Sequence, residues 1–212
     1  MRKNFTISLI IFFFINSFIY FEAKAKISTK IIVKVGDSII TSVDLQNEIM
    51  TNLHLKKLEL TQVNIDKTKN LSIQSLIKSS IKRIEVNKYD LKNFNKTDLN
   101  NYIIAIAKIF DTSPLGLKQV FKNLSIDYDV FVEKYKTELL WNTLIYQKFK
   151  NQININIIEV ETEIEILGKD KSENEIKEIK KKLLQKKKET KLDLFSRSHF
   201  STLESSIPIN FQ

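Results

Sequence analysis

The sequence predicts a mainly α-helical domain with a small β-hairpin, completed by a C-terminal helix and a short strand. Two observations support this fold class. Residues 31–40 alternate apolar side chains around Gly36-Asp37, which can supply the positive φ of a tight hairpin turn. Apolar residues then recur at helical spacing through most of the chain. A hairpin alone is marginally stable in water, so it needs packing partners from the helices.

The expected strand near the end of the chain is IPINF, residues 207–211. Pro208 has no N–H to donate, so this strand fits an edge or its own beginning and not a central position. We therefore expect Ile207–Phe211 to pair beside the hairpin, giving a small three-stranded sheet. The lysine-rich helix before it would bring the chain back across the helical core, and residues 26–212 would form one domain.

Seven helices are expected between the hairpin and the last strand. Thr41 is a suitable N-cap for the first, with Asp44 closing a capping box, and Thr97 for the third. Ser113-Pro114 is expected to open the fourth helix, and Gly168 to end the sixth. Residues 61–67 are expected to be a loop. The expected ranges are 42–58, 68–88, 98–111, 113–124, 127–150, 159–167 and 172–204.

Two of these helices carry patterns that predict their surroundings. In the second, six apolar residues are spaced for burial: Leu71, Leu76, Ile77, Ile81, Ile84 and Val86. The fifth carries apolar residues on more than one side, so other helices should enclose it. The seventh has seven lysines between Lys180 and Lys191 and only a thin apolar stripe. It fits a surface helix, or alternatively a basic amphipathic helix at a membrane surface.

Composition excludes several kinds of site. The 212 residues include no cysteine, so there is no disulfide framework, cysteine nucleophile or cysteine-based zinc site. Three glycines cannot build a glycine-rich phosphate loop, and His54 and His199 form no metal-binding pair. No metal, cofactor or catalytic residue is predicted. The net charge is +9, but only three of the 34 basic residues are arginine, so a nucleic-acid partner is not expected.

The first 25 residues have the pattern of a secretory signal peptide. Arg2 and Lys3 precede a mostly apolar run over residues 7–21, and Ala23-Lys24-Ala25 fits the small-x-small cleavage pattern. Cleavage is expected after Ala25, leaving a net charge of +7. An uncleaved anchor helix is the alternative, although the run is shorter than a spanning helix needs. An exported chain without cysteine fits the periplasm.

Two segments carry a resemblance to a known family. The first, VKVGDSIITSVDLQNEI, combines the hairpin, the Thr41 cap and the Asp44-Leu45 pair. The second is TDLNNYIIAIAKIFDTSPLGLKQVFKNLSIDYDVFVEKYKTELL. Together they resemble the N-terminal domain of SurA-type periplasmic chaperones for outer-membrane proteins, over about residues 30–167. The resemblance implies a nucleotide-independent holdase that binds unfolded outer-membrane polypeptides in an apolar groove. Tyr128 and Phe131 are the candidate peptide-binding residues.

The sequence departs from that family after Gly168. SurA-like proteins usually continue into parvulin-type isomerase domains, whereas only 44 residues follow Gly168 here. The short segment after Gly168 therefore favours a non-enzymatic chaperone. The label peptidyl-prolyl isomerase would rest on family analogy alone. A structural subunit of an envelope complex with the same fold is the second alternative.

Overall fold

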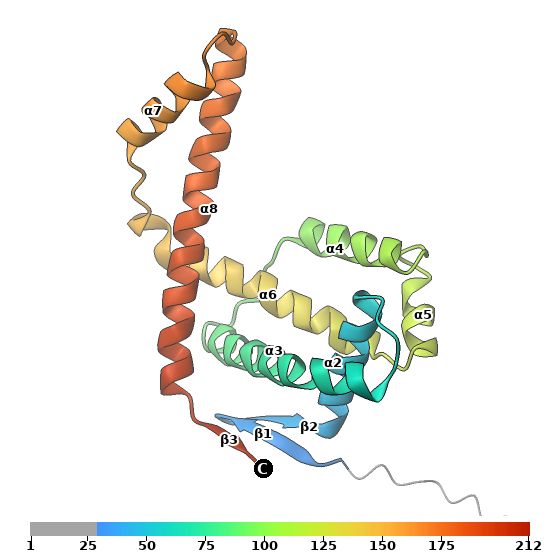
Figure 1. Ribbon diagram of the computed structural model, residues 1–212. Helices are drawn as coiled ribbons and strands as arrows, with labels where there is room; N and C mark the ends of the chain where they lie inside the picture. The colour runs from blue at the N-terminus through green and yellow to red at the C-terminus, as the bar shows by residue number, and fades with distance from the viewer. Residues whose placement is uncertain (1–28) are drawn as a thin grey trace, which may run out of the picture.

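A computed structural model describes residues 29–212, and the predicted signal peptide with its cleavage position lies outside this range (Figure 1). The described chain forms a helical domain with a three-stranded antiparallel sheet, which confirms the predicted fold class. The elements are β1 (Ile31–Val35), β2 (Ser38–Thr41), α2 (Ser42–Leu55), α3 (Gln62–Lys88), α4 (Lys96–Ile109), α5 (Leu117–Asn123), α6 (Tyr128–Phe149), η1 (Lys150–Gln152), α7 (Ile157–Leu167), α8 (Glu173–Ser206) and β3 (Ile209–Phe211).

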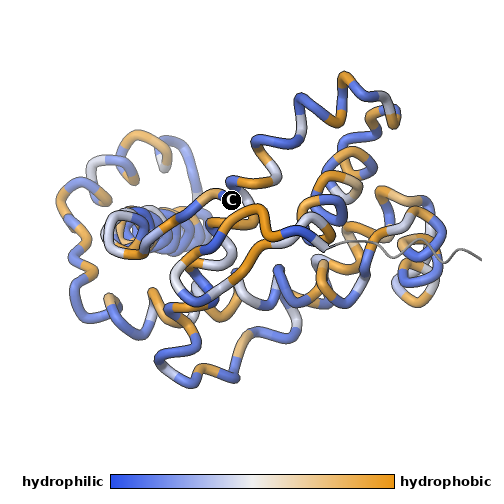
Figure 2. The backbone as a smooth tube through the Cα atoms, turned by 90° about the horizontal axis from the view of Figure 1, so that it is seen from below, coloured by the Kyte–Doolittle hydropathy of each residue, from blue (hydrophilic) through white to orange (hydrophobic). Residues whose placement is uncertain are grey.

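The sheet has the order β2-β1-β3, so the last strand pairs beside the hairpin as predicted. Gly36 has a φ of 54°, which supplies the turn. Val33 and Val35 of β1 are fully buried against the helices. Figure 2 shows the molecule from below, where the strands of the sheet include hydrophobic stretches. The two ends of the described chain therefore meet in one sheet.

Helix α6 is the central element of the domain. It contacts α3, α4, α5 and α8, so other helices enclose it as its apolar pattern predicts. One core cluster joins α6 to the sheet, α3 and α8, and a second joins it to α4 and α5. Trp141 in the first cluster and Phe121 in the second are the largest of the side chains that are almost completely buried.

Helix α8 has two different halves. Its second half lies along α6, where Trp141 donates a hydrogen bond to Ser196 (Nε1–Oγ 2.8 Å) and stacks on His199. Leu203, 8% exposed, belongs to the core cluster between the sheet and the helices. Its first half extends beyond the α2–α6 body and carries α7 beside it (Figure 1). We call α7 and residues 173–191 of α8 the arm.

Several helix boundaries differ from those predicted. Residues 62–67, expected to be a loop, form the first turns of α3, because Thr61 caps the helix by accepting a hydrogen bond from the Asn64 N–H. Helix α4 begins at Lys96, with Asn95 and not Thr97 as its N-cap. Helix α5 begins at Leu117 instead of Pro114, since residues 114–116 form a turn. Each of these predictions was wrong about the residue at which the helix begins.

The capping and burial predictions had mixed outcomes. The capping box between Thr41 and Asp44 is present, and Gly168 is the C-cap of α7. In α3, however, Leu71 is 56% exposed while its neighbour Ser72 is fully buried against α2. The face of α3 that meets α2 therefore includes small polar residues, and the apolar spacing placed Leu71 wrongly. No helix within residues 29–212 is long and apolar enough to cross a membrane.

Candidate functional site

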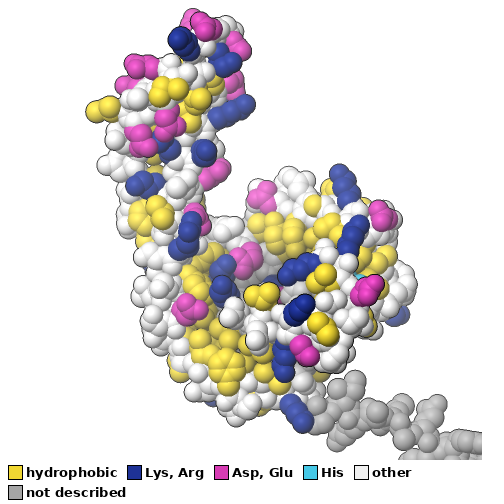
Figure 3. Space-filling view, viewed as in Figure 1, with side chains coloured by type: hydrophobic (Ala, Val, Ile, Leu, Met, Phe, Trp, Pro, Cys, Tyr) yellow, Lys and Arg dark blue, Asp and Glu magenta, His cyan; other side chains and the backbone are white. Residues whose placement is uncertain are grey.

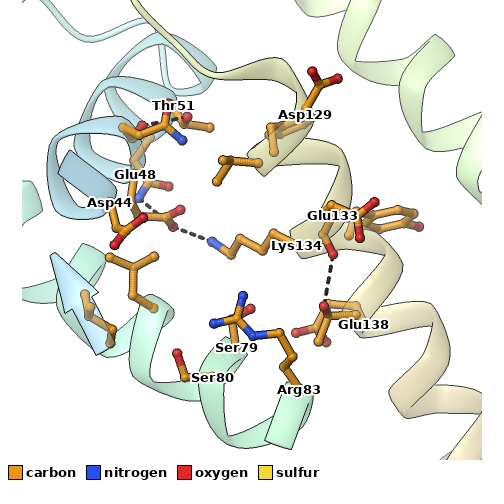
Figure 4. A pocket seen from close by; sticks show the side chains of 18 of the residues that line it. Asp44, Glu48, Thr51, Ser79, Ser80, Arg83, Asp129, Glu133, Lys134 and Glu138 are labelled. Carbon is orange, nitrogen blue, oxygen red and sulfur yellow. Dashed lines mark hydrogen bonds and ion pairs between the residues drawn. The ribbon is translucent and has the colours of Figure 1, made fainter. Parts of the chain in front are cut away.

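A groove lies between α2, α3 and α6, beside strand β2. Its cavity volume is about 690 Å³. Apolar, neutral hydrogen-bonding and charged side chains share the lining, and the charged ones are Asp44, Glu48, Arg83, Asp129, Glu133, Lys134 and Glu138. Figure 4 shows Ser79, Ser80 and Arg83 on α3, facing Lys134 of α6 across the cavity. The apolar members include Ile39, Ile40, Leu55, Leu76, Val130 and Phe131, and the neutral polar members include Asn47, Thr51, Asn52, Ser79, Ser80 and Thr137.

Strand β2 contributes an open edge to this groove. On β1, Gly36 and Ile32 make their backbone hydrogen bonds to Pro208 and Gln212 on the β3 side. Because hydrogen-bonding direction alternates along an antiparallel strand, Val33 and Val35 direct theirs to β2. Their partners on β2 are Ile40 and Ser38. Ile39, between those two, therefore turns its N–H and C=O to the outer edge of the sheet, and its side chain is 50% exposed.

An ion pair crosses the groove. Lys134 of α6 reaches Glu48 of α2, which is 5% exposed. Lys134 also donates to the hydroxyl of Ser75 (2.8 Å), and Asn52 donates to Glu48 (Nδ2–Oε1 3.3 Å). Both charged groups are thus satisfied inside the protein. The pair links α2 to α6 across the groove.

Stacked aromatic rings form one wall near the groove. Tyr102 of α4 stacks on Tyr135 of α6, with ring centroids 3.6 Å apart, and on Phe131 at 5.6 Å. Burial, with Tyr135 and Glu48 nearby, raises the pKa of Tyr102 to about 12. The phenol is therefore neutral near pH 7. This wall offers apolar contact and a hydrogen-bond donor, and no ionised group.

The two predicted peptide-binding residues occupy different places. Phe131 is 6% exposed and lies in the core cluster of α4, α5 and α6, where one side of it lines the groove. Tyr128 packs edge-on against Phe121 at 6.0 Å and lies under the ammonium group of Lys118. Tyr128 is not among the groove-lining residues. The structure therefore does not bring the two side chains together in one site.

Of the residues that line the groove, only Phe131 was singled out from the sequence as a site residue; Ile39, Ser79 and Arg83 are among those that were not. Ile39 belongs to the hairpin, whose register could be predicted from the sequence. The sequence did not show which helices lie beside it. Arg83 donates a hydrogen bond to the Ser38 hydroxyl (3.2 Å), linking α3 to β2. The sequence signal that could have pointed to Arg83 is that no other arginine occurs within residues 29–196.

A second polar cluster lies where α8 meets α3 and α6. The buried carboxylate of Glu85 accepts from Lys88 at 3.0 Å, and its other oxygen lies 3.0 Å from His199 Nε2. Burial of Glu85 raises its pKa, but the hydrogen bonds and charges of Lys88 and His199 outweigh burial and hold that pKa below its usual value. His199 stacks on Trp141 at 5.6 Å, which makes it an anchor for α8.

The described residues contain no group of three or more histidine, aspartate or glutamate side chains placed to hold a metal ion. No family model matches the chain, and no curated protein matches its sequence. The site is therefore defined by its own geometry. It is an open groove with an apolar, neutral polar and charged lining, next to the outer edge of β2 at Ile39.

Proposed function

We propose that the protein is a periplasmic chaperone of the holdase type, which binds unfolded outer-membrane polypeptides without nucleotide and assists their assembly. The observation that carries the proposal is the groove beside the open edge of β2. An extended chain can pair its backbone with Ile39 and place apolar side chains over Leu55, Leu76 and Phe131. The SurA-like sequence pattern and the predicted signal peptide support the same function and location.

The lining suits weak binding of many sequences. Backbone pairing and apolar contact do not depend on a particular order of residues, and the amides and hydroxyls of the lining can satisfy polar groups of a bound segment. A bound chain also loses conformational entropy, which keeps affinity modest. These properties fit a holdase, and the proposed function includes no chemical step.

The test is light scattering of a denatured outer-membrane barrel protein diluted into buffer, with and without this protein. We expect aggregation to slow at severalfold molar excess, for several unrelated clients. Ile39→Pro removes the outward N–H and should weaken the effect, because edge strands tolerate proline but lose that donor. Ile39→Thr keeps the N–H and is the matched control.

Two results would argue against the proposal. If the protein does not slow aggregation of any client, a structural subunit of an envelope complex becomes the better reading, and co-purification with one partner at fixed stoichiometry would support it. If the protein slows aggregation and Ile39→Pro is as active as Ile39→Thr, clients bind elsewhere than along β2.

A further inference from the structure

The outer face of α7 carries a concentration of exposed apolar side chains. Four of the eighteen large apolar side chains that are exposed within residues 29–212 lie on this helix of 11 residues. Ile158 is 75% exposed and Ile166 is 71% exposed. With Thr162 between them, they are spaced four residues apart and share one side of the helix. We call Ile158, Thr162 and Ile166 the α7 ridge.

The rest of the protein does not cover this ridge. The packing partner of α7 is α8. Val160, fully buried, and the ion pairs from Lys187 to Glu159 (2.7 Å) and Glu163 (2.8 Å) mark the side of α7 that faces α8. Thr162 and Ile166 lie away from that side, whereas Ile158, at the start of α7, also borders a hollow of about 880 Å³ between α7 and α8. The Thr162 hydroxyl donates to the carbonyl of Ile158 (3.0 Å), so the ridge exposes no unsatisfied hydroxyl donor.

The charge beside the ridge is negative. The sequence of α7, IIEVETEIEIL, has four glutamates and no basic residue. Glu159 and Glu163 pair with Lys187, whereas Glu161 and Glu165 are exposed and make no ion pair with any residue from 29 to 212. Figure 3 shows acidic and hydrophobic side chains together over α7, with basic side chains along the neighbouring α8. A protein with a net charge of +9 thus presents an acidic, apolar surface at the end of its arm.

We propose that the α7 ridge is a docking surface for a partner protein, and that the partner presents a basic amphipathic helix. Apolar side chains of that helix would cover Ile158 and Ile166, and its lysine or arginine side chains would meet Glu161 and Glu165. This surface is separate from the groove, so it does not depend on the holdase function.

Two other occupants fit the ridge less well. An anionic lipid surface would repel the glutamates of α7. A second copy of this chain offers a basic stretch in α8, but Leu194 is the one exposed large apolar side chain among the described residues of that helix. The lysines of α8 would match the charge of α7, but α8 has few exposed apolar side chains to cover the isoleucines.

The chain has no cysteine, so a single introduced thiol can report on the ridge. Thr162→Cys is labelled with a polarity-sensitive dye in the full chain. Thr202→Cys is the matched control, because Thr202 is also an exposed threonine that donates to the carbonyl four residues earlier on its helix. The probe is a synthetic amphipathic helix of about five turns with leucine on one face and lysine on the other. A version with glutamate in place of lysine is the charge control.

The lysine peptide should shift the dye at position 162 and not at position 202. Its affinity should exceed that of the glutamate peptide by at least about tenfold and should fall as salt is added. Glu161→Lys with Glu165→Lys should reverse the preference between the two peptides. Ile158→Ser with Ile166→Ser should weaken binding by at least about tenfold. Leu60→Ser with Val63→Ser, at an exposed residue just before α3 and another in its first turn, should leave binding unchanged.

Three results would overturn the proposal. Equal affinity for the two peptides would remove the role of the glutamates. Unchanged binding after Ile158→Ser with Ile166→Ser, with a circular dichroism spectrum like that of the wild type, would place the peptide elsewhere. A dye response only to anionic lipid vesicles, or a dimer that dissociates when Ile158 and Ile166 are replaced, would assign the ridge to a membrane or to a second copy.

Discussion

The docking of α8 can be tested with two leucines of the same helix. Leu203 is 8% exposed and lies in the core cluster with Trp141 and the sheet, whereas Leu194 is 51% exposed. Leu203→Ala removes three buried carbons and leaves a cavity. Such changes cost roughly 3–5 kcal/mol in a closed core. We expect about 2.5–3.5 kcal/mol here, because the site is at the end of a helix and can partly collapse.

In thermal unfolding followed by circular dichroism, that loss of stability corresponds to a fall in Tm of roughly 5–14 °C for a chain of this size. Leu194→Ala should change the free energy of unfolding by less than about 1 kcal/mol, because its side chain is half exposed. Equal melting of Leu203→Ala and wild type would show that the second half of α8 is not docked on the body. A separate early transition would show that α8 unfolds independently, which would also refute the reasoning.

Three further predictions concern charge and processing. Lys134→Ala should destabilise the protein by roughly 2–4 kcal/mol in denaturant unfolding, because it leaves the Glu48 carboxylate buried without its partner; Glu48→Gln with Lys134→Met should restore most of the loss. Glu85→Gln should lower the Tm at pH 7, and the difference from wild type should shrink below about pH 4. Folding lowers the pKa of the Glu85 carboxyl, so this group stabilises the protein above its unfolded pKa and loses the effect as pH falls through its folded pKa. A difference in Tm between Glu85→Gln and wild type that stays constant with pH would contradict this. Mass measurement of the exported protein should show a chain that begins after Ala25, and a chain that retains residues 1–25 would contradict the predicted signal peptide.

Much of the fold could be predicted from local patterns. The hairpin turn at Gly36 and the capping box of Thr41 and Asp44 depend on residues within a few positions of each other, and both are present. The pairing of β3 with β1 is a long-range contact. Pairing beside the hairpin was predictable because a short apolar segment that contains Pro208 needs a sheet edge. The sequence did not indicate which hairpin strand it joins, and the strand begins at Ile209 instead of Ile207. The first turns of α3 were missed because TQVNID carries no apolar stripe and depends on the Thr61 cap.

The candidate site was much less predictable. Its lining comes from three helices and a strand, and a helical pattern shows that a face is buried without showing which neighbour buries it. Phe131 was named for its position near the start of a long helix, and it does line the groove, whereas Tyr128 packs against Phe121 instead. His199 and Trp141 are 58 residues apart, and only the packing of α8 against α6 brings their rings together.

The most direct test of the proposed function is photo-crosslinking from inside the groove. Ser79→Cys, on the α3 wall of the groove, and Ser201→Cys, exposed on α8, are each labelled with a benzophenone. Each is then illuminated with a denatured outer-membrane barrel protein diluted from denaturant. The proposed function predicts crosslinks to the client from position 79, competed by a second unfolded client, and few from position 201. Equal crosslinking from both positions, or none from position 79, would contradict it.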